Sequence, residues 1–79
     1  MIMNYNKIKR ELYFKINDVL TASNGKPVRL SQLHLLAKTL YGLGETSVNK
    51  YIQNLEEEGF VKYVGESGDE IVAIARLPL

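Results

Sequence analysis

The sequence contains no cysteine, and this excludes several kinds of site at once. None of its 79 residues can form a disulfide, ligate a metal as a thiolate or act as a cysteine nucleophile. A fold of this size then depends on packing alone, so association into a homodimer would help to stabilise it. The chain also lacks any run of ~20 uncharged apolar residues that would span a bilayer. We therefore expect one soluble domain, residues 1–79, that makes no contact with a membrane.

Signatures of catalysis and secretion are missing as well. His34 is the only histidine, so a metal site would lack nitrogen partners and an acid–base pair would lack a nucleophile. We expect this residue at the surface or at the rim of the core. No glycine-rich phosphate loop is present, and residues 42–44 are better explained as a turn between helices. The first residues lead directly into a charged segment at Lys7, unlike a secretory signal. The sequence thus predicts a cytoplasmic protein that is not an enzyme and uses no cofactor, metal or small-molecule substrate.

The net charge of +1 conceals two parts of opposite sign. Residues 1–54 carry eight basic and three acidic side chains, a net charge of +5. Residues 55–79 carry two basic and six acidic side chains, a net charge of −4. Because a basic segment attracts phosphate and an acidic one repels it, the first part is the candidate for contact with phosphate groups.

Helical periodicity dominates the first part of the chain. From residue 4 to about residue 22, apolar side chains recur in steps of three and four, which is typical of one face of an amphipathic helix. Residues 23–27 combine asparagine, glycine and proline, so the helix is expected to end there. The next three residues, 28–30, are long enough only for a fragment of a strand.

A second helix is predicted to start at Gln32. Ser31 is a plausible N-cap, and Leu30 and Leu35 are placed to form a hydrophobic staple around it. Gly42 stands where a C-terminal glycine would end the helix. The expected buried face consists of Leu33, Leu36, Ala37 and Leu40.

A third helix is predicted over residues 45–58, followed by a hairpin. Its apolar face is expected to consist of Val48, Ile52 and Leu55. Gly59 is the stop signal for this helix. Residues 60–64 and 71–77 are rich in β-branched and aromatic side chains, and the polar segment 65–70 lies between them. This pattern predicts a β-hairpin.

The order of these elements, α-β-α-α-β-β, resembles the winged helix-turn-helix family of small single-domain transcriptional regulators. The most specific part is residues 43–61, LGETSVNKYIQNLEEEGFV, which is similar to a recognition helix that leads into its wing. The resemblance implies an α+β fold with three helices and a C-terminal β-hairpin wing. It also implies sequence-specific binding of double-stranded DNA, with helix 45–58 in the major groove and transcription regulation as the role.

The third helix has a polar face suited to reading bases. With 100° per residue and Val48 as the buried reference, this face lies ~100° to 200° away from the core. Short hydroxyl side chains allow close approach to phosphate, amides can pair with adenine, and lysine reaches phosphate or guanine. The residues expected to read bases are Thr46, Ser47, Asn49, Lys50 and Gln53. The residues expected to contact phosphate are Lys7, Lys9, Arg10, Arg29, Lys38 and Lys50, with Lys62 and Arg76 as a further pair near the base of the hairpin. The alternative for each group is an ordinary solvated surface.

Two features depart from the simplest DNA-binding pattern. The expected wing tip carries acids, at Glu66, Asp69 and Glu70, where DNA-binding wings usually carry basic residues. Either this wing points away from DNA, or the domain is a protein interaction module of a replication or transcription assembly that docks through the acidic wing. The first helix and the segment 71–75 also carry more apolar area than one face can bury. A homodimer joined through these elements would cover it, and the alternative is that one core accommodates them all.

Overall fold

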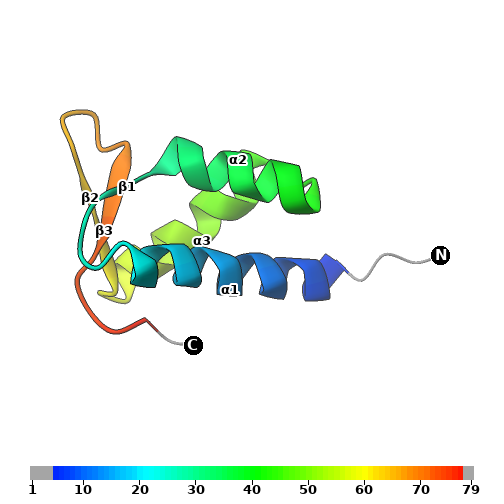
Figure 1. Cartoon of the computed structure of the whole chain (residues 1–79), viewed down its shortest axis with the longest axis horizontal. Coiled ribbons are helices and arrows are strands. Elements are labelled where there is room, and N and C mark those ends of the chain that lie inside the picture. Colours follow the sequence, from blue (N-terminus) through cyan, green and yellow to red (C-terminus); the bar gives the residue numbers. More distant parts are fainter. Residues whose placement is uncertain (1–4, 78–79) are drawn as a thin grey trace.

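Residues 5–77 form three helices and a small sheet (Figure 1) in a computed structural model that describes these residues apart from the side chain of Tyr5. The elements are α1 (Tyr5–Ala22), β1 (Val28–Arg29), α2 (Leu30–Tyr41), α3 (Glu45–Glu57), β2 (Val61–Val64) and β3 (Glu70–Ala73). This confirms the α+β class and the predicted order of elements. The expected first helical residue, Asn4, lies outside the described residues. Within residues 5–77, no helix is both long enough and apolar enough to cross a membrane.

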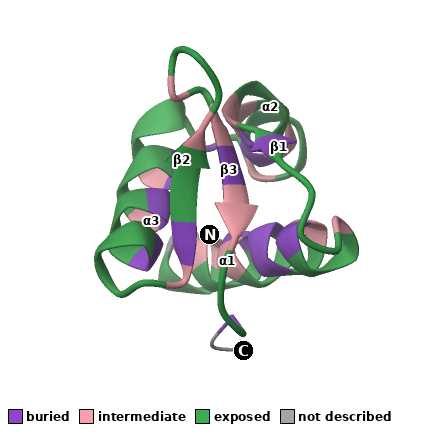
Figure 2. Cartoon of the chain, turned by 90° about the vertical axis from the view of Figure 1, so that its left-hand side faces the viewer, coloured by how far each residue is buried: buried purple, intermediate pink, exposed green. Residues whose placement is uncertain are grey.

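The sheet covers one end of the helices, and its central strand comes last in the sequence (Figure 2). β3 pairs with β1 and with β2, antiparallel in both cases. Ile71 of β3 lies opposite Val28 of β1 and opposite Tyr63 of β2. Ile71 of β3 and Val61 of β2 are both buried, with exposed fractions of 0% and 1%. In the register of these strands they lie on the same face, because alternate residues of a strand point to the same side of a sheet. The inner face of the sheet therefore closes the hydrophobic core.

One hydrophobic core joins all six elements. The helical stripes predicted from periodicity supply most of it, because residues three or four positions apart share one side of a helix. Its buried members are Leu12, Ile16, Leu20, Val28, Leu33, Ala37, Leu43, Val48, Ile52, Leu55, Val61, Ile71 and Leu77. The three apolar residues expected on the third helix are all among them.

The start of α2 differs from the prediction. The helix begins at Leu30, and Arg29 occupies the N-cap position without a side-chain hydrogen bond. Ser31 is therefore not the N-cap. The Leu30 N–H donates instead to the backbone carbonyl of Asp69, at 2.9 Å, because the pairing of β1 with β3 brings the hairpin to this helix end. The predicted staple is also wrong, since Leu35 is 66% exposed.

The end of α2 is where predicted, but its buried face is shorter. Gly42 adopts the left-handed conformation (φ 66°), and its N–H donates to the carbonyl of Lys38. The turn then directs Leu43 into the core, where that side chain fills the space beside the last turn of the helix. Leu36 is half-buried and packs against the core, whereas Leu40 is 55% exposed and is not the core residue that was expected.

Helix α3 ends one residue before the predicted Glu58. Gly59 has a positive φ of 84°, which glycine adopts without steric cost. The Phe60 N–H donates to the carbonyl of Leu55 and the Gly59 N–H to that of Glu56, which together form a Schellman motif. The predicted stop at Gly59 is therefore confirmed.

The second strand of the hairpin is shorter than the predicted 71–77. β3 ends at Ala73, and the N–H groups of Ile74 and Ala75 both point to the carbonyl of Phe60. The chain leaves the sheet there, and Leu77 returns to the core. Ile74 remains 54% exposed. An exposed apolar residue therefore follows directly after β3, within the segment 71–75 whose apolar area was expected to exceed what one face can bury.

Candidate nucleic-acid interface

The polar face of α3 is the best candidate for an interface. Val48, Ile52 and Leu55 of this helix are 0 to 2% exposed, so they fix which side faces the core. The residues on the opposite side are all exposed: Thr46, Asn49, Lys50 and Gln53. The predicted division of this helix into a buried and a polar face is therefore confirmed. Ser47, which was also expected to read bases, is half-buried rather than exposed. It lies ~100° around the helix from Thr46 and therefore off the fully exposed face.

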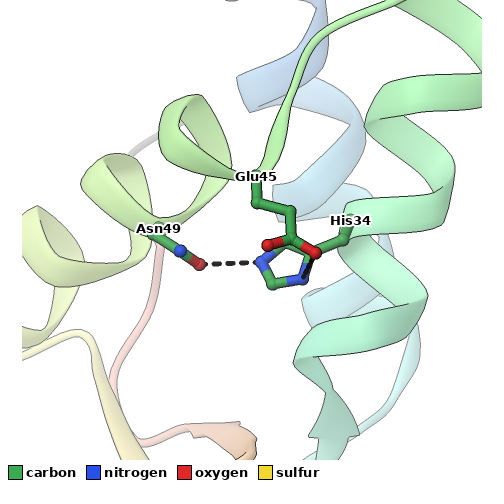
Figure 3. Close-up of polar contacts among 3 residues, drawn as sticks. All are labelled: His34, Glu45 and Asn49. Carbon is green, nitrogen blue, oxygen red and sulfur yellow. Dashed lines mark hydrogen bonds and ion pairs between the residues drawn. The ribbon is translucent and has the colours of Figure 1, made fainter.

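His34 of α2 contacts this face of α3 (Figure 3). The Nε2 atom of His34 lies 2.7 Å from the Oδ1 atom of Asn49, which is a hydrogen-bond distance. Its Nδ1 atom lies 3.8 Å from a carboxylate oxygen of Glu45. The His34 side chain is 19% exposed, so it sits at the rim of the core, as predicted. The imidazole therefore connects α2 with the first turns of α3.

The two contacts of His34 differ in strength. An amide oxygen can only accept a hydrogen bond, so Nε2 must be the donor to Asn49. The distance to Glu45 exceeds a hydrogen bond, and this carboxylate is 75% exposed. Attraction between exposed charges at such a distance contributes little in water. The bond to Asn49 is therefore the contact that fixes the ring.

A depression of about 530 Å³ lies beside these residues. His34, Leu35 and Lys38 line it from α2, and Glu45 lines it from α3. Of the predicted phosphate contacts, Lys38 is the one that this depression places near the start of α3. The structure thus places Lys38 in the same depression as Glu45, the first residue of α3.

The other predicted cations lie elsewhere. Lys9 and Arg10 belong to α1, which packs through Tyr13 against Tyr51 of α3. Tyr51 lies ~160° around α3 from Gln53, so α1 covers the side of α3 opposite to the polar face. The structure therefore does not gather these two cations with the proposed base-reading residues.

The two predicted cations of the sheet have different surroundings. Arg29 lies opposite Glu70 in the pairing of β1 with β3, so an acid is its cross-strand neighbour. Lys62 is exposed and lies opposite Val72 in the pairing of β2 with β3. It alternates with the buried Val61 and therefore projects from the outer face of the sheet. Of the two, Lys62 is the cation without an acid directly opposite it in the sheet register.

The loop of the hairpin forms an acidic edge beside α2. Glu66 and Asp69 are exposed, and Glu70 is half-buried. The hydrogen bond from Leu30 to the Asp69 carbonyl holds this loop at the first turn of α2. The acidic loop therefore lies at the first turn of α2, whereas Lys38 lies in the last turn of that helix.

Contacts between α1 and α3 are the feature that the sequence reasoning missed. The rings of Tyr13 and Tyr51 stack with centroids 3.9 Å apart and an interplanar angle of 8°. The Tyr51 hydroxyl donates to Oδ1 of Asn17, which is 2% exposed, at 3.0 Å. Burial raises the pKa of Tyr51 above its ordinary value, although the hydrogen bond to Asn17 acts in the opposite direction. Burial likewise raises the pKa of Tyr63, with a smaller contribution from Glu56. The only sequence signal was the surplus of tyrosine and phenylalanine on the first helix.

This stack also bears on the expected homodimer surface. Tyr13 finds a partner within the chain, so part of the surplus aromatic area is covered internally. Phe14, on the same helix, remains 50% exposed.

Residues 5–77 contain no group of three histidine, cysteine, aspartate or glutamate side chains arranged to hold a metal ion. The geometry of the site is therefore that of a polar helix face flanked by a lysine and an imidazole. Comparison of the chain with protein-family models, with curated proteins and with solved structures gave no match.

Proposed function

We propose that this protein is a winged helix-turn-helix domain that binds double-stranded DNA and regulates transcription. In this proposal α3 lies in the major groove, α2 supports it, and the hairpin of β2 and β3 is the wing. The observation that supports it most is the exposed face of α3, which carries amide, hydroxyl and ammonium groups on a helix anchored by three buried residues. Helices with such faces fit the width of the major groove.

The side chains have distinct roles in this proposal. Lys50, Thr46 and Gln53 reach base edges or the phosphates beside them, because they project away from the core on successive turns. Lys38 contacts the phosphate backbone next to the start of α3. Such phosphate contacts supply affinity that does not depend on sequence and that weakens with salt.

Fluorescence anisotropy of a labelled random-sequence duplex at several salt concentrations tests the proposal. We expect binding that weakens steeply as salt increases and that is lost in Lys50→Glu. Lys15→Glu is the matched control, because it makes the same change of charge at an exposed position of α1. Absence of binding at low salt, or equal loss in both variants, would refute the proposal.

The acidic loop supports a second candidate, a protein interaction module that docks a basic partner through the hairpin. Glu66 and Asp69 are exposed at one edge of the molecule, and Glu70 faces Arg29 across the sheet. Neutral amides at the three acidic positions distinguish the candidates. They should strengthen DNA binding if the domain binds DNA, because repulsion of phosphate is removed. They should weaken capture of a basic partner if the loop is the docking site.

Association into a homodimer is part of the first proposal. Phe14 and Ile74 are each at least 50% exposed, and such side chains favour burial against a second copy. A symmetric dimer would present two copies of α3 to one duplex. Sedimentation equilibrium tests this, with Phe14→Ser expected to shift the protein towards the monomer.

A further inference from the structure

The bond between His34 and Asn49 lies at a position from which the proposed interface would read a base. We propose that His34 is a positioning residue that determines which atoms Asn49 presents to DNA, so that the protein selects guanine rather than adenine at that position. This inference rests on the proposed function. It follows from three observations: the 2.7 Å contact, the placement of His34 at the core rim and the exposure of Asn49.

The contact fixes the orientation of the Asn49 amide. Figure 3 shows Oδ1 turned towards the imidazole of His34, which approaches from α2. The His34 side chain is itself only 19% exposed, at the rim of the core. Rotating the amide to turn Oδ1 outward would break this bond and place the amide NH₂ against the donor Nε2–H. The Asn49 amide therefore keeps Oδ1 directed towards His34 of α2, and its NH₂ group is the part that is available to DNA.

This orientation of the Asn49 amide favours one base over another, because each base presents its own donors and acceptors in the major groove. Pairing of asparagine with adenine uses both amide atoms, because N7 of adenine accepts and its N6 amino group donates. Guanine presents two acceptors, N7 and O6, and no donor at that edge. An asparagine whose oxygen is held by another side chain offers donors, so guanine is the better match. Removal of His34 releases the amide, and adenine then becomes the favoured base.

Glu45 and Asn49 favour different positions for the hydrogen on the neutral imidazole of His34. A carboxylate beside Nδ1 favours a hydrogen on that nitrogen, whereas Asn49 requires one on Nε2. The shorter contact to Asn49 and the high exposure of Glu45 decide in favour of Nε2–H. A ring with hydrogen on both nitrogens satisfies the two contacts together. Either form keeps Asn49 in the same orientation.

The first experiment examines the protein alone. Long-range ¹H–¹⁵N NMR spectra of the neutral imidazole distinguish hydrogen on Nε2 from hydrogen on Nδ1. We expect Nε2–H in the wild type, and we expect the balance to move towards Nδ1–H in Asn49→Ala. A neutral ring that carries its hydrogen on Nδ1 in the wild type would overturn the inference, since Asn49 would then have to turn its NH₂ towards His34.

The second experiment selects preferred sequences from a randomised duplex library with the wild type and with His34→Ala. We expect guanine at one position in the wild type and a roughly tenfold change in the guanine-to-adenine ratio towards adenine at that position in His34→Ala. The other positions should not change. His34→Gln restores a side-chain N–H donor and should restore guanine. Leu40→Ala is the matched control, because it alters an exposed residue of the same helix that does not line the depression, and it should leave the preference unchanged.

The outcomes separate the inference from the function on which it rests. If the wild type shows no salt-dependent binding to duplex DNA, the proposed function fails and the inference fails with it. If the wild type binds, and wild type and His34→Ala select the same base, only the inference fails. Thermal unfolding of each variant shows whether it is folded, and the NMR measurement on the wild type does not depend on any variant.

Discussion

Replacement of Tyr51 by phenylalanine should destabilise the protein more than its loss of one oxygen atom suggests. The hydroxyl donates to Oδ1 of Asn17, which is 2% exposed and therefore has little access to water. Leaving a buried polar group without its partner costs about 1–3 kcal/mol. For a domain of this size each kcal/mol lowers the melting temperature by about 4–8 °C.

A double-mutant cycle provides the sharper assay. Asn17→Leu combined with Tyr51→Phe removes both partners of the hydrogen bond and leaves apolar groups in their place, a change that can be nearly neutral. Tyr51→Phe combined with Asn17→Leu should therefore be more stable than Tyr51→Phe alone. Tyr13→Phe is the control, because it keeps the stacked ring and leaves the contact between Tyr51 and Asn17 intact. Urea unfolding followed by circular dichroism measures all four free energies of unfolding. A loss below about 0.5 kcal/mol in Tyr51→Phe, or additive effects in the cycle, would refute the reasoning.

Three further predictions follow from burial and backbone geometry. Burial raises the pKa of Tyr51, so the folded protein keeps the hydroxyl proton at pH values where the unfolded chain, with a tyrosine pKa of about 10, has lost it. The free energy of unfolding should therefore fall as the pH rises above that value, and it should fall less in Tyr51→Phe. Urea titrations at alkaline pH would measure this difference. Ile52→Ala should lower the free energy of unfolding by about 2–5 kcal/mol, because this side chain is fully buried. Gln53→Ala should change it by less than about 0.5 kcal/mol, because Gln53 is exposed. Similar losses of stability for the two variants in chemical denaturation would contradict the assignment of the two faces of α3. Gly59→Ala should cost about 1–2 kcal/mol because φ is 84°, and the added Cβ would meet no atom within 4 Å, so the cost comes from the backbone alone. Gly44→Ala, at the N-cap of α3 with φ −81°, should cost less, because this backbone conformation is open to alanine. Equal melting temperatures for the two variants would argue against a backbone origin.

The sequence predicted the fold well where periodicity and glycine positions carry the information. The apolar stripe of α3 and its end at Gly59 follow from local rules, and both are present. The start of α2 was missed because its first N–H is satisfied by the carbonyl of Asp69, a residue distant in the sequence. No local capping rule contains that partner. Leu40 was also misplaced, because the helical period does not show that Leu43, beyond the end of α2, is the buried leucine there.

The candidate site was only partly accessible to sequence reasoning. The exposure of Lys50 and Gln53 follows from the helical period alone. The pairing of His34 with Asn49 depends on how α2 and α3 pack against each other, and a helical wheel of either helix cannot supply it. The placement of Lys9 and Arg10 away from the polar face depends in the same way on the packing of α1.

The central position of β3 sets the order in which the sheet can assemble. β2 and β3 are joined by a short loop, so bringing them together costs little chain entropy, and a hairpin of this kind closes within microseconds. In the sheet β1 pairs with β3 alone, and pairing Val28 with Ile71 closes a much longer loop through α2 and α3, at a larger cost in chain entropy. We therefore expect β1 to be added late in folding, and slowing its addition would leave an open strand edge on an otherwise formed hairpin.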